Sequence, residues 1–176
     1  MNEDKIKKAV YDLLVAIGED PSRDGLIDTP RRVSNMYKEL LSQDKINYTT
    51  FESTYDDIII VKDIEFSSMC EHHLLPFFGV VHVAYIPNNK IIGLSKIARV
   101  VEKYAKRLQV QERMTEEILQ DLRDNLNTDN IAIYVEAKHM CMVARGVRKE
   151  LSSTVTVKLS GKFKNDRKDD FYSLIR

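Results

Sequence analysis

The sequence predicts an α+β fold, and three observations favour it. Apolar residues follow helical spacing up to about residue 41, and from about residue 56 the spacing changes to that of strands. Two more helical segments follow, and they stand together between strands instead of alternating with them. The chain has 176 residues, of which 43% are hydrophobic, so it can bury the core of one domain.

The first unit, residues 1–55, is expected to hold two helices. Apolar residues within 6–17 recur at i, i+3, i+4 and i+7, which predicts an amphipathic helix that Gly18 ends. Thr29-Pro30 predicts the start of a second helix, with the threonine as N-cap and the proline at the first helical position. Residues 44–55 are polar and aromatic, so we expect them to link this unit to the next.

The second unit, residues 56–176, is expected to contain a helix pair between groups of strands. Ser95 predicts the N-cap of one helix, and Thr115 predicts the N-cap of the other. The charged tail that starts at Asn165 ends in aromatic and apolar residues, which we expect to dock on the fold. Strands are expected at residues 58–61 with 64–66, at 78–86, at 91–92, at 131–143 and at 151–163.

The overall composition excludes several classes of protein. Lys+Arg and Asp+Glu both number 27, and a general nucleic-acid binder would instead carry a basic excess. The longest apolar runs are far too short to span a bilayer, and the first residues lack the apolar region of a secretory signal. Two cysteines do not make a disulfide scaffold. We therefore expect a cytoplasmic protein with reduced thiols.

The histidines of this chain gather around its two cysteines. Three of the four histidines lie within three residues of a cysteine, which favours a joint role over chance. Cys70 and His73 have chelating spacing, and His139 and Cys141 would share one face of a predicted strand. Zinc takes thiolate and imidazole ligands, so the pattern predicts a zinc site. The candidate ligands are Cys70, His72, His73, His139 and Cys141.

These five candidates leave two kinds of metal site open. A structural site would use four of them, whereas a catalytic site would use three plus a water and leave two histidines for proton transfer. Spacing alone does not decide which histidines bind. Each cysteine taken singly is also compatible with an ordinary buried apolar residue. The fourth histidine, His82, alternates with apolar residues and is interpreted as a hydrogen-bonded strand residue.

Two basic segments are candidates for binding an anion. Residues 93–99 lie where a strand is expected to lead into a helix, and a helix N-terminus with Lys96 and Arg99 on one face suits a phosphate. A plain serine N-cap with solvated charges explains the same residues. A second basic set, which includes Arg145, follows Cys141 and suggests an anionic substrate beside the metal. Between the two predicted helices, Glu112 is either a surface charge or a reader of a base.

Several long motifs, in order, resemble those of the GTP cyclohydrolase I family. The resemblance runs from about residue 5 to the C-terminus. The turn at residues 127–130 departs from it, because the family often has Pro-Gly there. The motifs are Cys-Glu-His-His-Leu-Leu-Pro-Phe-Phe-Gly at 70–79, Gly-Leu-Ser-Lys-Ile-Ala-Arg at 93–99, Arg-Leu-Gln-Val-Gln-Glu-Arg at 107–113, His-Met-Cys-Met at 139–142 with Arg-Gly-Val at 145–147, Asp-Thr-Pro-Arg-Arg-Val at 28–33 and Ser-Gly-Lys-Phe at 160–163.

The resemblance implies a tunnelling fold, which is a four-stranded antiparallel sheet with a helix pair, here over residues 56–176, preceded by an N-terminal helical extension. Such sheets join into a toroidal homo-oligomer, usually a decamer, with active sites at subunit interfaces. By position, the resemblance implies Cys70, His73 and Cys141 as zinc ligands, and His72, His139 and Ser95 as catalytic residues. The resemblance also implies that Gln111 and Glu112 contact guanine, that Leu94 and Val110 line the pocket, and that Ser95 and the basic residues face the ribose and triphosphate. The substrate contacts that it implies are Leu94, Lys96, Arg99, Val110, Gln111, Glu112, Arg145 and Arg32.

The implied reaction converts GTP and water into 7,8-dihydroneopterin triphosphate and formate, in tetrahydrofolate biosynthesis. It needs a nucleophile on C8 of the purine and proton transfer to the ring nitrogens and the ribose, which suit zinc and imidazole. Two alternatives remain open. One is a non-enzymatic protein with a structural zinc site, and the other is a sister tunnelling-fold enzyme, the nitrile reductase that acts on a deazaguanine with a nucleophilic cysteine.

Overall fold

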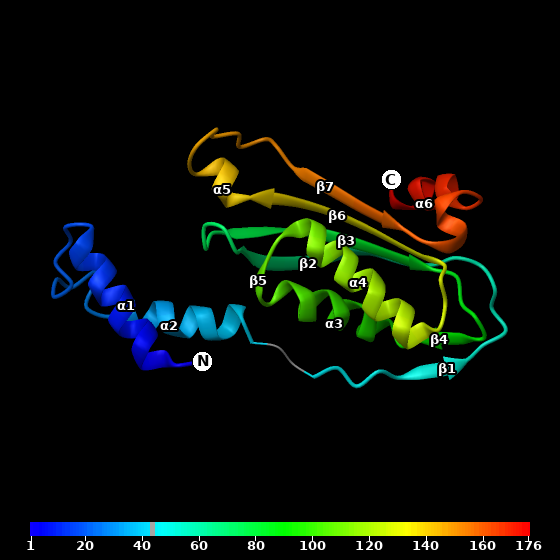
Figure 1. Ribbon diagram of the computed structural model, residues 1–176, viewed down its shortest axis with the longest axis horizontal. Helices are drawn as coiled ribbons and strands as arrows, with labels where there is room; N and C mark the ends of the chain where they lie inside the picture. Colours follow the sequence, from blue (N-terminus) through cyan, green and yellow to red (C-terminus); the bar gives the residue numbers. More distant parts are fainter. Residues whose placement is uncertain (43–44) are drawn as a thin grey trace. The chain divides into compact units, whose positions relative to one another are not determined.

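The computed structural model describes residues 1–42 and 45–176 (Figure 1). The chain divides into two compact units, residues 1–42 and 43–176, so the boundary falls earlier than the expected position after residue 55. Within the expected linker, Asp44 lies outside the described residues. Ile46 and Tyr48 pack against the core of the second unit, which explains why this unit begins before the expected boundary.

The first unit consists of helices α1 (Glu3–Ala16) and α2 (Thr29–Leu40). Gly18 follows α1 with a φ of +87°, a left-handed conformation that glycine adopts at little cost. The side chain of Lys38 on α2 pairs with Glu3 on α1 at 2.8 Å. The prediction of Thr29 as N-cap is wrong. Asp28 occupies that position without a capping side-chain bond, and its carboxylate pairs instead with arginines of the first turn.

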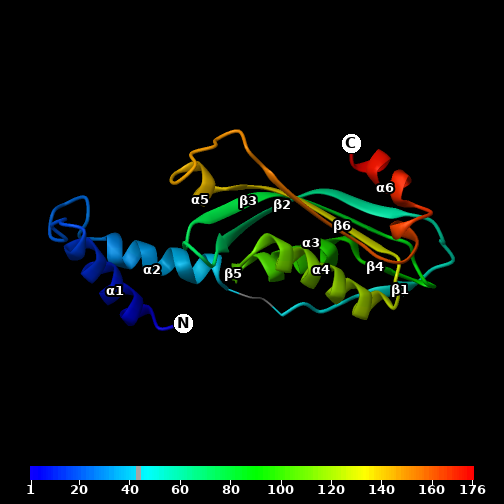
Figure 2. The same ribbon diagram turned by 45° about the horizontal axis from the view of Figure 1, so that its top comes forward.

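The second unit is built on a sheet with strand order β5-β2-β3-β6-β7 (Figure 1). Four strands run antiparallel, and the two-residue β5 lies parallel to β2 at one edge. Helices α3 and α4 cover one face of this sheet (Figure 2). The predicted α+β class is therefore confirmed. The bounds are β2 Ile59–Cys70, β3 Pro76–Tyr85, α3 Leu94–Ala105, β5 Leu108–Gln109, α4 Gln111–Leu126, β6 Ile131–His139 and β7 Thr154–Leu159.

Burial on both faces of the sheet follows from the alternation of side chains along each strand. On β3, Val81 and Val83 pack into the core beneath α3 and α4, whereas Ala84 belongs to a second cluster. This second cluster contains Phe171 of helix α6 (Lys168–Ile175), which is fully buried against Phe163. The prediction that the C-terminal tail docks on the fold is therefore confirmed.

Two short strands form a separate small sheet. Strand β1 (Thr50–Glu52) pairs antiparallel with β4 (Lys90–Ile92), so part of the expected linker is a strand. Asn89 has a φ of +61° in the turn before β4, as expected for an asparagine turn. Every helix among the residues described is too short or too polar to cross a membrane.

Further predicted element ends differ from the structure. Gly93, not Ser95, is the N-cap of α3, and α4 begins at Gln111 instead of after Thr115. Thr115 lies inside α4, where its hydroxyl donates to the carbonyl of Gln111 at 2.8 Å, so it does not cap the helix. The strand expected at residues 151–163 is shorter than predicted, because β7 gives way to a 3-10 turn at Gly161–Lys164.

Candidate functional site

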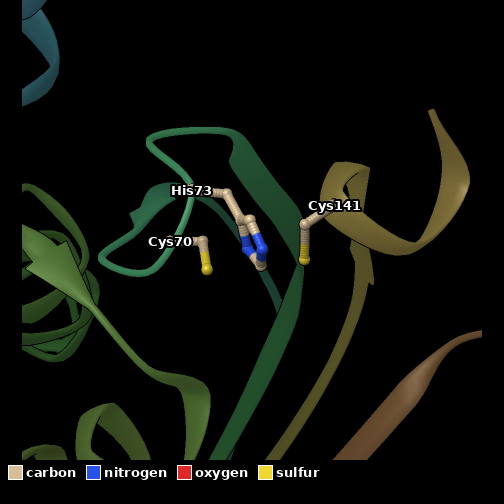
Figure 3. A group of neighbouring side chains, drawn as sticks. All are labelled: Cys70, His73 and Cys141. Carbon is tan, nitrogen blue, oxygen red and sulfur yellow. The ribbon is translucent and has the colours of Figure 1, made fainter. Parts of the chain in front are cut away.

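Three of the five candidate ligands form one group. The Sγ atoms of Cys70 and Cys141 and a ring nitrogen of His73 all lie within 4.8 Å of one another. Figure 3 shows the imidazole of His73 between the two sulfur atoms, with all three side chains pointing the same way. Ligands of a tetrahedral zinc ion with bonds of about 2.3 Å to sulfur stand roughly 3.8 Å apart, so the group fits a metal ion.

The hairpin between β2 and β3 brings Cys70 and His73 together. Cys70 ends β2, and its carbonyl accepts a hydrogen bond from the amide of Leu74 at 2.9 Å. Its own amide donates to the carbonyl of Leu75, also at 2.9 Å. Leu74 adopts a left-handed φ of +53°, which lets the chain reverse within these few residues. The turn therefore places His73 beside the thiol of Cys70.

Cys141 reaches the group from a helical turn and not from a strand. The prediction of a strand over residues 131–143 is wrong, because β6 ends at His139 and the chain continues as α5 (Met140–Val143). Consequently His139 and Cys141 do not share a strand face. Cys141 joins the metal group, while Nε2 of His139 lies 2.7 Å from Oε1 of Gln111.

Burial and neighbouring charge shape the chemistry of the group. Burial, and then the adjacent thiol of Cys70, raise the pKa of Cys141. Two thiolates at this separation repel each other, so a bound cation would favour their ionised forms. A guanidinium also reaches the group, because Nη1 of Arg145 lies 2.6 Å from Nε2 of His73. The donor set of two thiols and one imidazole is of the kind that binds zinc.

The two remaining histidines differ in their surroundings. His72 is exposed, and its Nδ1 lies 4.0 Å from Sγ of Cys70. His139 is half-buried and stacks in parallel on the fully buried ring of Phe77, with centroids 4.7 Å apart. Burial lowers the pKa of His139, and the charge of Glu112 opposes this shift. The sequence did not single out Phe77, although it stands opposite His139 in the register of β3 and β6.

Strand β5 brings the segment around Gln111 to the metal group. Gln109 is the register partner of Cys70, and its carbonyl accepts from the amide of Glu71 at 3.1 Å. Arg113 pairs with the carboxylate of Glu71, which ties the start of α4 to the β2–β3 hairpin. Glu112 is exposed in the first turn of α4, and Val110 is its half-buried N-cap.

The phosphate-binding candidates on α3 do not lie near this group within one chain. Helix α3 begins at Leu94, next to β4, and ends beside β5, where Cys70 is paired. Figures 1 and 2 show β4 and β5 at opposite ends of α3. A helix of 12 residues is about 18 Å long, so Ser95 stands roughly that far from the metal group.

The remaining basic candidates and His82 differ in the partners that their side chains have. Arg32 lies on α2 in the first unit, where it pairs with Asp28 at 3.6 Å. Lys96 and Arg99 form no ion pair with any residue in the ranges 1–42 and 45–176. Nδ1 of the buried His82 accepts from the amide of Asp63 at 3.0 Å, which confirms the interpretation of His82 as a hydrogen-bonded strand residue.

Comparisons with known proteins identify the family of this chain. The model of the family described as GTP cyclohydrolase I matches residues 6–176. GTP cyclohydrolase 1 of Sulfurihydrogenibium sp. is 50% identical over 99% of this chain and 96% of its own length, and that of Clostridium kluyveri is 49% identical over 100% and 99%. Among solved structures, the apo form of the archaeosine synthase QueF-Like aligns with 62% of this chain and 97% of its own, at a TM-score of 0.49 and 18% identity.

Proposed function

The chain belongs to the GTP cyclohydrolase I family, and from this premise we propose that it converts GTP and water into 7,8-dihydroneopterin triphosphate and formate. This reaction supplies the pterin of tetrahydrofolate biosynthesis. The observation that carries the proposal for this chain is the group of Cys70, His73 and Cys141, with His72 and His139 beside its ligands in sequence.

We assign zinc to this group because its donor set suits that ion. Two thiolates and one imidazole are common zinc ligands, and three protein ligands leave one coordination position for water or substrate. A structural site would require a fourth protein ligand, whereas the group found in the described residues has three members. When bound, zinc supplies a Lewis acid that makes water nucleophilic near neutral pH.

We assign the proton transfers that the reaction requires to two imidazoles. They are those of His72, which is exposed beside Cys70, and of His139, which is half-buried beside Gln111, and imidazole is the side chain most often used for general acid–base catalysis. Their proposed task is to move protons to and from the purine nitrogens and the ribose as each ring opens. Burial of His139 favours its neutral form, in which one nitrogen accepts a proton and the other donates one.

The triphosphate is assigned to the start of α3 and to Arg145. The amides at the N-terminus of α3 and the side chains of Lys96 and Arg99 together suit a polyanion. We assign the ribose to the hydroxyl of Ser95, which is exposed in the first turn. Arg32 on α2 is proposed as one further phosphate contact.

The position of α3 supports an active site shared between copies of this chain. Ser95 stands about one helix length from Cys70, so the ribose contact assigned to Ser95 would not lie beside the metal group of the same chain. A second copy would supply the missing residues. Strand β7 is an outer strand of the sheet with apolar Val155 and Val157 partly exposed, which supports pairing with a neighbouring sheet.

We therefore propose a homo-oligomer, a toroidal decamer by analogy with the family. Sedimentation at micromolar concentration tests it directly. A complex of several chains is expected, with activity confined to that complex. An active monomer of 20.4 kDa would contradict the proposal.

One assay tests the proposed activity against its alternatives. The zinc-loaded protein is incubated with GTP, and pteridine fluorescence and formate are followed together. Both products are expected in the absence of any nicotinamide. His72→Ala should keep zinc but reduce the rate by roughly a hundredfold or more, as expected for loss of a general acid or base. Absence of both products in the zinc-loaded oligomer would refute the function.

A further inference from the structure

The side chain of Gln111 is enclosed by hydrogen-bond partners. It is 1% exposed, although it is the first residue of α4. Its amide nitrogen donates to the carbonyl of Val135 at 3.1 Å, to the carbonyl of Thr154 at 3.0 Å and to Oγ1 of Thr156 at 3.2 Å. Its Oε1 lies 2.7 Å from Nε2 of His139. This side chain therefore has no free donor with which to hold guanine.

The partners of Gln111 fix which way its amide faces. Backbone carbonyls only accept, so the NH₂ group must face Val135 and Thr154, and Oε1 must face His139. The neighbouring hydroxyls agree with this direction. The hydroxyl of Thr115 donates its hydrogen to the carbonyl of Gln111. In the 2.7 Å contact between the two threonine hydroxyls, Thr156 must therefore be the donor and Thr115 the acceptor. The lone pairs of the Thr156 hydroxyl then remain available to accept from the side-chain amide of Gln111.

The direction of the Gln111 amide determines the hydrogen on His139. Oε1 of an amide is only an acceptor, so Nε2 of His139 must carry a hydrogen at this contact. In a neutral imidazole the other nitrogen, Nδ1, is then bare and accepts protons. The ring is also held in plane, because it stacks on Phe77 with an angle of 3° between the rings.

We propose that Gln111 is a positioning residue that holds His139 in the Nε2–H tautomer and leaves Nδ1 as the atom that exchanges a proton with GTP. The proposal rests on the proposed function, in which His139 moves a proton. It also replaces the guanine contact that the family resemblance implied for Gln111. In the assigned arrangement, β6 and β7 hold the amide through Val135 and Thr154, and the amide holds the histidine.

The direct test is nitrogen-15 solid-state NMR of the zinc-loaded protein with labelled histidine. The spectrum distinguishes a bare ring nitrogen from one that carries hydrogen, and the signals that disappear in His139→Gln identify this residue. We expect Nδ1 of His139 to be bare and Nε2 to be protonated in the wild type. Any other protonation pattern would overturn the proposal, and this result requires no variant at Gln111 to fold.

Gln111→Met is the matching perturbation, and Gln109→Met is its control. Gln109 is also fully buried and uses both ends of its amide, on Tyr104, Glu117, Val110 and Arg113, but it does not touch His139. Only Gln111→Met should move the nitrogen signals of His139 toward a mixture of tautomers. Identical shifts of these signals in both variants would indicate a general loss of packing and overturn the assigned role.

Steady-state kinetics add a second readout. Gln111→Met should lower kcat by roughly ten- to a hundredfold and leave KM for GTP within about twofold, since this amide does not hold the substrate. A large rise in KM with kcat unchanged would return Gln111 to guanine recognition and overturn the proposal. If the wild type fails to turn over GTP at all, the proposed function fails, while the NMR result still decides the tautomer.

Discussion

Glu112 is expected to recognise guanine, and Glu112→Gln tests this role. The residue is exposed in the first turn of α4, where the helix dipole stabilises a negative charge. Its carboxylate has no hydrogen bond or ion pair with the parts of the chain that the structure describes, so both oxygens are available to a ligand. A carboxylate accepts from two adjacent guanine donors, the ring N–H and the exocyclic amine. Adenine has no such pair on that edge.

The expected magnitude follows from the lost bond. Glutamine keeps the size of Glu112 but removes the charge and turns one acceptor into a donor that faces a donor. The loss of a charge-assisted hydrogen bond in a desolvated complex costs roughly 2–4 kcal/mol. This corresponds to a fall in kcat/KM for GTP of about 30- to 1,000-fold. Zinc content should not change.

Glu116→Gln is the matched control, because it lies one turn further along the same helix. Glu116 is also exposed, and its carboxylate pairs with Lys158 at 2.5 Å. Removal of a surface ion pair of this kind changes free energies by less than about 1 kcal/mol. Glu116→Gln should therefore turn over GTP at close to the wild-type rate.

Inosine triphosphate, which lacks the exocyclic amine, completes the test. The wild type should prefer GTP strongly, because inosine triphosphate leaves one carboxylate oxygen of Glu112 without a donor. In Glu112→Gln the ratio of kcat/KM for GTP to that for inosine triphosphate should be smaller than in the wild type. The substitution and the loss of the exocyclic amine remove the same interaction, so their effects are not additive. An unchanged ratio of the two kcat/KM values, or wild-type turnover of GTP by this variant, would refute the reasoning.

Three further predictions concern the metal, pH and packing. Cys141→Ser should lose bound zinc in metal analysis while His72→Ala keeps it, and one zinc per chain in Cys141→Ser would exclude the assigned ligand set. Burial lowers the pKa of His82 from its ordinary value of 6.5, so protonation of His82 opposes folding. The free energy of unfolding should therefore be highest above about pH 6.5 and should fall as the pH drops below it, and this fall should be smaller in His82→Gln. Urea unfolding measures both pH profiles, and equal profiles would contradict the prediction. Gly79→Ala should reduce the free energy of unfolding by roughly 3 kcal/mol or more, because its Cβ would lie 1.9 Å from the carbonyl oxygen of Glu136, and an unchanged urea midpoint would refute it.

The sequence by itself determined the class of the fold and the residues of the candidate metal group. Helical and strand periodicities arise from local burial, so they were sufficient for α+β and for the helix pair. The concentration of histidines around Cys70 and Cys141 predicted a metal site, and the structure brings three of the five candidate ligands into one group that could hold a metal ion. The ends of the helices were less well predicted. Thr29, Ser95 and Thr115 are residue types that favour the N-cap position, but the N-caps in the structure are Asp28, Gly93 and Val110.

Tertiary structure alone decided which of the candidate site residues lie together. The side-chain amide of Gln111 donates to carbonyls of β6 and β7, and these two strands are distant from Gln111 in the sequence. His139 and Cys141, two residues apart, face different partners because the strand ends between them. The distance of Ser95 from the metal group likewise follows from the path of α3 across the sheet. Side-chain direction depends on packing between remote segments, and local periodicity contains no information about that packing.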